Sequence, residues 1–273
     1  MSGGLLIKQG LIRDDIISAE PREIQHGRIE VTNRDITANL PYAMHAHLCF
    51  NHHVNETVRV AGTENLIIDP NAPSAAHVIY DYFGGPAGFS NISQDMVAAV
   101  DKADLAQYSE AEVLAPADWT LLNFILDPRT GLNRHGQFAI SDDQLMRDMM
   151  VYCRRHTIGE ILDLPDVRER TQFFWLQEES AEKQIKAHAT ITGGVVTIDL
   201  REMSEIYGCN RFLAYGLYPY ALVSITALPG DDDNKVLFAV GRSIINHHST
   251  ANICLLVLEN GGGGHLPSGE IIP

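Results

Sequence analysis

The sequence is poor in cysteine, in long apolar runs and in basic residues, and each shortage excludes a class of protein. Its four cysteines are scattered, with no Cys-x-x-Cys pair, so neither a disulfide framework nor a zinc knuckle is expected. The longest apolar runs, such as Ala221–Ile225 and Ile253–Leu258, fall far short of the roughly 20 residues that a membrane helix needs. No basic region or cleavage site of a secretory signal opens the chain. We therefore predict a cytoplasmic protein without membrane association.

The shortage of basic residues bears on the ligands. Lysine and arginine number 20 against 35 acidic residues, which gives a formal net charge of −15. This balance argues against a protein that binds duplex nucleic acid through a broad basic face. A small phosphorylated substrate is still compatible, because divalent cations can reverse the sign of an acidic pocket.

The length of 273 residues suits two domains. Strands alternate with helices in both halves, which predicts an α/β fold of two domains with mainly parallel sheets. We expect the first domain over residues 1–165, a linking helix over 166–189 and a smaller second domain over 190–273. The apolar and β-branched patterns predict strands at 29–32, 46–50, 195–200, 212–217, 221–228 and 236–240. The helical patterns lie at 3–10, 74–82, 93–102, 166–189 and 252–258.

Two adjacent histidines follow the apolar stretch that ends in Phe50 and Asn51. In an open α/β sheet, ligands collect at the carboxyl ends of the strands. Adjacent side chains on a strand point to opposite faces, so His52 and His53 can act together only if the backbone turns there. One imidazole could then bind a divalent metal ion while the other faces a phosphate. The alternative is a pair of surface histidines in a loop.

Carboxylates occur at comparable places. Asp35 follows the strand expected at 29–32, where it could bridge two metal ions or cap the next turn through backbone amides. Asp101 and Asp104 lie near a predicted helix end and have the same ambiguity. Carboxylates together with imidazole suit manganese or magnesium, and two such ions can clamp an in-line phosphoryl displacement.

A run of four glycines precedes a histidine near the C-terminus. Glycine amides can approach an anion closely because no Cβ intervenes, although the run could also be a plain linker. The histidine could donate a hydrogen bond to a phosphate oxygen, and an Arg-Ser pair that leaves the strand at 236–240 could add a second anion contact. These candidate substrate-binding residues are Gly261, Gly262, Gly263, Gly264, His265, Arg242 and Ser243.

Together, Asn51-His52-His53, the segment Asp101–Asp104 and the Gly-Gly-Gly-Gly-His run resemble the DHH/DHHA1 phosphoesterases, in particular their exopolyphosphatase-like branch. The resemblance covers nearly the whole chain and includes Asp127–Leu132. It implies a DHH-type parallel-sheet domain and a smaller DHHA1-type α/β domain. It also implies hydrolysis of phosphodiester or phosphoanhydride bonds in short oligonucleotides, nucleotides or polyphosphate, with Mn²⁺ or Mg²⁺ as cofactor.

Transferred residue by residue, the resemblance assigns five roles in the first domain. Asp35 becomes the bridging metal ligand, His52 a metal ligand and His53 the side chain that faces the substrate phosphate. Asp101 matches a further metal ligand, with Asp104 as the second choice. The glycine run and the histidine after it resemble the phosphate clamp of the DHHA1 domain.

The sequence also departs from the family pattern. It begins just past the strand that ends in Asp-x-Asp-Gly, and it stops at Pro273 without the last helix. Asn51 occupies the place of an aspartate that orients the neighbouring histidine, so metal binding is expected to be weakened. The chain therefore resembles an N-terminally truncated or degenerate member, or one whose start codon is assigned too late.

These departures leave several functions open. We expect little manganese-stimulated phosphatase activity, so whether the chain is an active hydrolase stays open. The alternatives are an inactive member that binds a phosphorylated ligand or partner, and a decayed gene product. A homodimer is also compatible with the sequence.

Overall fold

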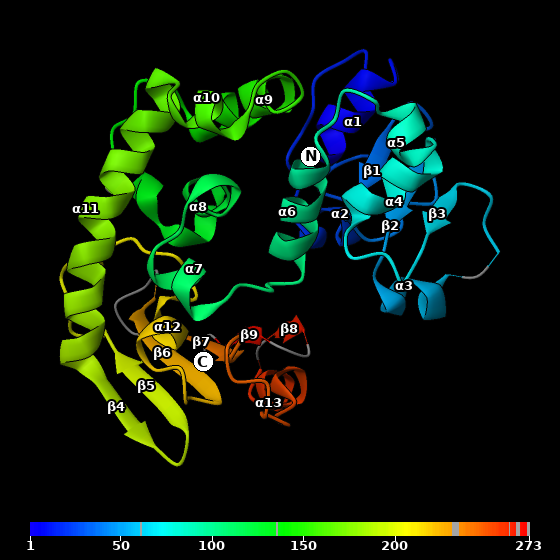
Figure 1. Ribbon diagram of the computed structural model, residues 1–273. Coiled ribbons are helices and arrows are strands. Elements are labelled where there is room, and N and C mark those ends of the chain that lie inside the picture. The colour runs from blue at the N-terminus through cyan, green and yellow to red at the C-terminus, as the bar shows by residue number, and fades with distance from the viewer. Residues whose placement is uncertain (61, 135, 231–234, 262, 266–267, 272–273) are drawn as a thin grey trace. The chain divides into compact units, whose positions relative to one another are not determined.

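The computed structural model describes residues 1–273 except 61, 135, 231–234, 262, 266–267 and 272–273 (Figure 1). The chain forms two compact units, each assembled from two segments. The first unit contains Met1–Gln107 and Asp143–Ile161, and the second contains Tyr108–Asp142 and Leu162–Pro273. Both units combine helices with a sheet, so the expected α/β class is confirmed.

The first unit contains a parallel sheet of three strands in the order β1-β2-β3. The strands are β1 (Ile36–Ala38), β2 (Leu48–Asn51) and β3 (Leu66–Ile68). The central strand is the most deeply buried, and Phe50 is completely inaccessible to solvent. Since all three strands run the same way, their carboxyl ends meet at one edge of the sheet, where ligands of open α/β sheets bind.

Helices surround this sheet. Helix α4 packs against β2, α1 and α6, and Tyr82 lies edge-on to the Phe50 ring at 5.4 Å. The Ser74 hydroxyl accepts a hydrogen bond from the backbone N–H of His77 and so caps the start of α4. The helices are α1 (Ser2–Lys8), α2 (Pro21–Gln25), α3 (Val54–Arg59), α4 (Ala75–Tyr82), α5 (Gly85–Gly88), α6 (Gln94–Asp104), α9 (Asp142–Tyr152) and α10 (Ile158–Leu162).

One strand of this unit lies elsewhere than the sequence suggested. Residues 29–32 form no strand, and the first strand is Ile36–Ala38. A carboxylate oxygen of Asp35 accepts hydrogen bonds from the backbone N–H and the hydroxyl of Thr32, both at 2.7 Å. This side-chain turn redirects the chain before the sheet begins. The helices expected at 3–10, 74–82 and 93–102 are confirmed as α1, α4 and α6.

The second unit contains a mixed sheet in the order β4-β5-β6-β7-β9-β8. Among the described strands of this sheet, β5 and β6 alone pair in parallel, so the expectation of a mainly parallel sheet is wrong here. Gly193 and Gly194, both with positive φ, form the two-residue turn between β4 and β5, and such a turn requires an antiparallel hairpin. The strands are β4 (Ala189–Thr192), β5 (Val195–Asp199), β6 (Val223–Pro229), β7 (Val236–Arg242), β8 (Gly263–His265) and β9 (Ser268–Ile271).

A helix of 24 residues, α11 (Pro165–His188), runs along the second unit and contributes Ala181 and Ile185 to a core with β5. The helix expected over 166–189 is therefore confirmed as a helix, and its role as a link between domains stays a prediction. The shorter elements are α7 (Glu110–Leu114), α8 (Asp118–Leu126), η1 (Pro128–Thr130), η2 (Leu132–Arg134), α12 (Leu213–Leu217) and α13 (Ile253–Glu259).

The strand expected at 212–217 is the helix α12 instead. Asn210 explains the difference. Its side-chain oxygen accepts from the backbone N–H of Phe212, while its amide group and its backbone N–H both donate to the buried carboxylate of Glu178 on α11. These contacts begin the helix and override the strand propensity of the aromatic residues.

The compact units divide the chain differently from a boundary at residue 165, so that boundary stays a prediction. In the described ranges, no helix combines the length and apolar character needed to cross a membrane. Of the four free cysteines, Cys49 is buried and the others are half-buried.

Candidate metal and phosphate site

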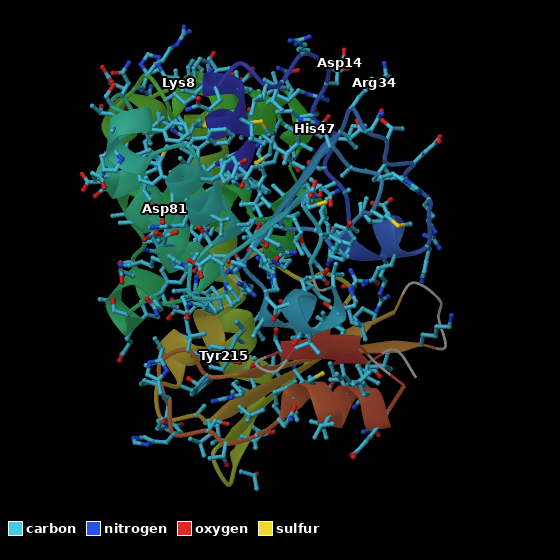
Figure 2. The ribbon with its side chains drawn as sticks, turned by 90° about the vertical axis from the view of Figure 1, so that its right-hand side faces the viewer. Lys8, Asp14, Arg34, His47, Asp81 and Tyr215 are labelled. Carbon is cyan, nitrogen blue, oxygen red and sulfur yellow. The ribbon has the colours of Figure 1, made fainter. Side chains whose placement is uncertain are left out.

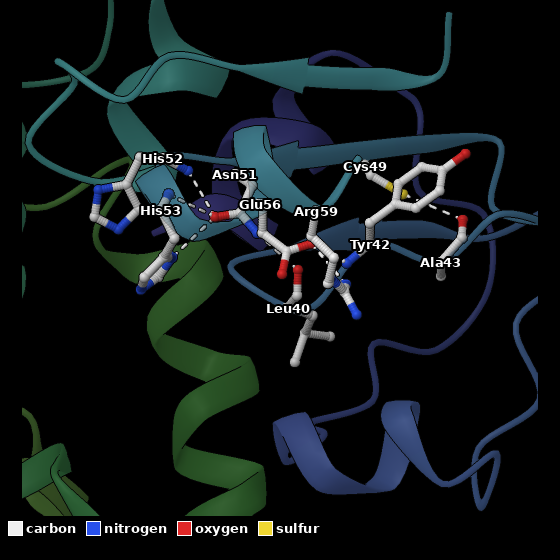
Figure 3. A network of polar contacts seen from close by, with 9 residues as sticks. All are labelled: Leu40, Tyr42, Ala43, Cys49, Asn51, His52, His53, Glu56 and Arg59. Atoms are coloured by element: carbon white, nitrogen blue, oxygen red, sulfur yellow. Dashed lines mark hydrogen bonds and ion pairs between the residues drawn. The ribbon is translucent and has the colours of Figure 1, made fainter. Parts of the chain in front are cut away.

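Asn51 organises the carboxyl end of β2 (Figure 3). Its side-chain oxygen accepts hydrogen bonds from the backbone N–H groups of His52 and His53 and from Nδ1 of His53, at 2.7–2.9 Å. Its amide nitrogen donates to the Leu40 carbonyl at 2.8 Å. The backbone therefore turns directly after the strand, and the two imidazole rings lie 4.5 Å apart. The backbone turn that His52 and His53 need in order to act together is therefore present.

These contacts fix the proton position on each imidazole. The Asn51 oxygen can only accept, so Nδ1 of His53 carries a hydrogen. The Ala72 carbonyl lies 3.2 Å from Nδ1 of His52 and requires a hydrogen on that nitrogen as well. Neutral His52 therefore has its lone pair on Nε2, which is the form that binds a metal ion.

Nε2 of His52 is buried and lies 2.9 Å from a carboxylate oxygen of Asp104. Protonated Nε2 can donate a charge-assisted hydrogen bond to Asp104, whereas the neutral ring with its hydrogen on Nδ1 leaves Nε2 without a hydrogen bond to a described residue. Asp104 raises the pKa of His52, burial lowers it, and Ala72 and Asp101 add smaller increases. A lone pair cannot face a carboxylate at this distance without repulsion, so the contact requires a proton or a cation.

Asp101 lies one helical turn before Asp104 on α6 and faces a second histidine. One of its oxygens accepts from the Ser74 hydroxyl at 2.7 Å, and the other lies 2.6 Å from Nδ1 of His77. The pair His77–Asp101 therefore connects the first turn of α4 to α6, next to the pair His52–Asp104. His77 also lies 3.6 Å from Asp81, which is labelled in Figure 2.

The structure thus brings His52, His53, Asp101 and Asp104 to one edge of the sheet. It adds residues that the sequence analysis did not assign to the site: His77, the Ser74 hydroxyl as a donor, and Asn39. The signal for His77 was its place three residues after a helix cap that follows a strand. Asn39 follows β1 with a φ of 59° and donates its backbone N–H to the Phe50 carbonyl.

Asp35 is not part of this group. It precedes β1, and its carbonyl accepts from the backbone N–H of His47, so it lies at the amino edge of the parallel sheet. Figure 2 labels its neighbours Arg34 and His47. The hydrogen bonds from Thr32 lower the pKa of its carboxyl. The turn-capping alternative is therefore what the structure contains at Asp35.

The predicted anion contacts of the second unit are engaged in local structure. Arg242 donates to the Ser249 carbonyl at 2.7 Å, and the Ser243 hydroxyl accepts from two backbone N–H groups of the following turn. Residues Gly263–His265 form β8 rather than a loop and pair with β9. Gly262 and the side chain of His265 lie outside the described part of the chain.

The side chains at the site show whether they fit a divalent metal ion. Within the part of the chain that is described, no group of three or more His, Cys, Asp or Glu side chains is arranged to hold a metal ion. The buried Nε2 of His52 nevertheless lacks a hydrogen-bond partner there and lies against Asp104. An imidazole lone pair beside carboxylates fits Mn²⁺ or Mg²⁺ in donor type.

No family model and no curated protein sequence matches the chain. Among solved structures, the pGpG-specific phosphodiesterase PggH from Vibrio cholerae is 41% identical, with a TM-score of 0.87 over 99% of this chain and 88% of that one. An exopolyphosphatase-related protein from Bacteroides fragilis is 12% identical, with a TM-score of 0.42 over 82% of this chain and 57% of that one. An uncharacterized protein from Helicobacter pylori is 11% identical, with a TM-score of 0.31 over 98% of this chain and 89% of that one.

Proposed function

Since this chain belongs to the DHH/DHHA1 phosphoesterase family, we propose that it is a metal-dependent phosphodiesterase that cleaves short oligonucleotides such as pGpG. The observation that carries the proposal is the 41% identity to a pGpG-specific phosphodiesterase over 99% of the chain. Addition of water to the one phosphodiester bond of pGpG yields two molecules of guanosine monophosphate.

His52 and Asp104 would hold the divalent ion, with Asp101 as the neighbouring carboxylate. The ion, when bound, supplies Lewis acidity and lowers the pKa of bound water. The residues of the chain prepare this site before any ion binds. Ala72 sets the His52 tautomer, and the Ser74 and His77 contacts hold Asp101 in place. Asp35 lies at the other edge and has no role in this proposal.

His53 is the candidate phosphate contact. Asn51 holds its Nδ1 as a donor, so Nε2 is the nitrogen that gains a proton when the ring becomes charged. A protonated His53 would donate from Nε2 to a phosphate oxygen in a charge-assisted hydrogen bond. Asn51 thus positions the His53 ring and the backbone of both histidines.

A second candidate function is binding of a phosphorylated ligand without turnover. The observation that favours it is the neutral amide of Asn51, which cannot raise the basicity of the His53 imidazole, or add negative charge beside His52, as a carboxylate would. If Asn51 weakens metal binding as expected, the chain would bind the ligand but would not hydrolyse it.

The test is incubation of the purified full chain with pGpG and Mn²⁺, followed by chromatographic measurement of released guanosine monophosphate. The proposal expects release that EDTA abolishes and that His52→Ala reduces. Equilibrium binding of pGpG in EDTA is measured in parallel. Binding without release supports the second candidate, and the absence of both contradicts the two functions together.

A further inference from the structure

Two loops of the second unit meet at a backbone hydrogen bond. The Thr130 carbonyl accepts from the N–H of Cys209 at 3.0 Å. A Cβ on Gly208 would lie 3.0 Å from the same carbonyl, so the loops pack with little spare room. This junction holds Arg129, on η1, beside Arg211, which precedes α12.

Both arginines share a single carboxylate. Asp127 receives the planar fork of Arg129 through Nε and Nη2, each at 2.7 Å, and lies 3.7 Å from Nε of Arg211. Among the described residues, two guanidinium groups therefore face one carboxylate, and the ion pairs of this cluster leave one positive charge unbalanced. The excess stands out in a chain with a formal net charge of −15.

The Arg211 side chain packs on an aromatic ring and is partly withdrawn from water. Its guanidinium carbon lies 4.3 Å above the Phe212 ring, and its side chain is 31% exposed. None of the hydrogen bonds among the described residues uses a terminal nitrogen of Arg211. Burial and then the charge of Arg129 lower the pKa of Arg211 to about 10, which is the direction expected for a cation that lacks a sufficient counterion.

Tyr108 completes the cluster on the Phe212 side. Its ring is buried and lies 5.7 Å from that of Phe212, and its hydroxyl accepts from the amide of Asn123 at 2.9 Å. Burial raises the pKa of Tyr108, so the hydroxyl keeps its proton and can still donate. The nearby Glu112 is used by the cap of α7, where it binds Ser109.

The chain contains a second Asp-x-Arg fork for comparison. Arg201 donates through Nε and Nη2 to Asp199 at 2.9 and 2.6 Å, in the pattern of Arg129 and Asp127. That pair is balanced, one cation to one anion, and both side chains are about half exposed. The second arginine is therefore the feature that distinguishes the cluster at Asp127.

We propose that Arg129, Arg211 and Tyr108 form a binding site for a terminal phosphate, the 5′ phosphomonoester of a short oligonucleotide. An oxyanion there would neutralise the excess charge and accept from the terminal nitrogens of Arg211 and the Tyr108 hydroxyl. The choice of an oligonucleotide as the source of the phosphate rests on the proposed function, whereas the anion site itself does not.

The test compares equilibrium binding of pGpG and of GpG, which lacks the 5′ phosphate, to the full chain in EDTA. Arg211→Gln and Arg129→Gln should each weaken pGpG binding about tenfold or more and leave GpG binding unchanged. Arg201→Gln is the matched control and should change neither. Arg129 is 60% exposed, so its replacement keeps the test valid if Arg211→Gln fails to fold. Equal losses for both ligands, or no loss, would overturn the proposal.

If the wild-type chain binds no pGpG, the proposed function fails and tripolyphosphate becomes the probe. A rise in thermal unfolding temperature with tripolyphosphate that Arg211→Gln and Arg129→Gln abolish, and Arg201→Gln preserves, would support the anion site with another phosphate source. The same rise in all variants, or none in any, would overturn the site as well.

Discussion

Each unit of the molecule contains a buried polar cluster, and the two clusters differ in how completely their atoms are used. In the second unit, the Asn210 amide donates to Glu178 at 2.6 Å and to the Val113 carbonyl at 3.1 Å, and its backbone N–H donates to the other Glu178 oxygen. In the first unit, neutral His52 leaves its buried Nε2 without a hydrogen bond to a described residue, 2.9 Å from a carboxylate oxygen of Asp104.

The difference separates structure from function on physical grounds. A buried polar group without a partner costs free energy, so it persists where a ligand or a proton will satisfy it. The Glu178–Asn210 cluster leaves no open donor on Asn210 and holds α11 to the segments around α7 and α12. The His52–Asp104 pair, by contrast, can still take up a proton or a metal ion between its two side chains.

The largest expected effect is on catalysis and concerns the His52–Asp104 pair. His52→Ala should lower manganese-dependent pGpG hydrolysis by about 100-fold or more, because loss of a ligand should exceed the 10–100-fold typical of its outer partners. Asp35→Ala is the matched control and should leave the rate within about twofold, since Asp35 lies at the opposite edge of the sheet. Release of guanosine monophosphate measures both. Equal losses would restore Asp35 to the site.

Substitutions in the Glu178–Asn210 cluster should change the stability of the protein rather than its activity. Asn210→Ala should lower the free energy of unfolding by about 2–4 kcal/mol. It removes the side-chain donor to the buried Glu178 carboxyl group and to the Val113 carbonyl, and leaves only the backbone N–H of residue 210 as a donor to Glu178. Asn246→Ala removes two exposed hydrogen bonds, one donated to the Tyr220 carbonyl and one accepted from the His248 N–H, and should cost about 1 kcal/mol or less. Urea denaturation of both variants gives the comparison. Similar losses would mean that the cluster is not specially stabilising.

Asn51→Asp should strengthen metal binding next to the His52–Asp104 pair and at the same time lower the stability of the fold. A carboxylate at this position would add negative charge directly beside His52 and should increase Mn²⁺ affinity about tenfold. The same change removes the hydrogen bond to the Leu40 carbonyl and should cost about 1–2 kcal/mol of stability. Calorimetric titration with Mn²⁺ and thermal unfolding measure the two effects. Unchanged affinity would contradict the assigned role of Asn51.

The smallest effect concerns pH. Burial raises the pKa of Glu178 to about 7 from its ordinary 4.5, and the donors from Asn210 oppose this. The folded state therefore holds a proton that the unfolded state has released, and its stabilising contribution is lost as pH rises toward 7. We expect wild type to lose about 1 kcal/mol between about pH 6 and pH 8 relative to Glu178→Gln. Parallel pH dependences would show that Glu178 stays ionised.

The sequence was sufficient for what local pattern determines. The apolar stretch before Asn51 predicted β2, and the paired histidines after it predicted a site at the carboxyl edge. The strand expected at 29–32 was wrong because two short β-branched stretches, at 29–32 and 36–38, are alike in pattern. Only the side-chain turn to Thr32 decides which one enters the sheet.

Long-range contacts account for the other differences. The helix α12 depends on a carboxylate 32 residues away, Glu178, which no local pattern at 212–217 could reveal. The role of His77 depends likewise on Asp101, which is 24 residues further along the chain. By contrast, Gly193-Gly194 did carry a hairpin signal, and a two-residue turn there indicates antiparallel pairing.

The Ser74 hydroxyl has two partners at once: it accepts from the first turn of α4 and donates to Asp101. Alanine at this position would lose both contacts, whereas threonine could keep the hydroxyl if its extra methyl fits a side chain that is 2% exposed. In a selection for activity from a library randomised at this codon, survivors should therefore be confined to hydroxyl residues. The Ser74 side chain thus couples the start of α4 to the position of Asp101, so that neither can change in evolution without the other.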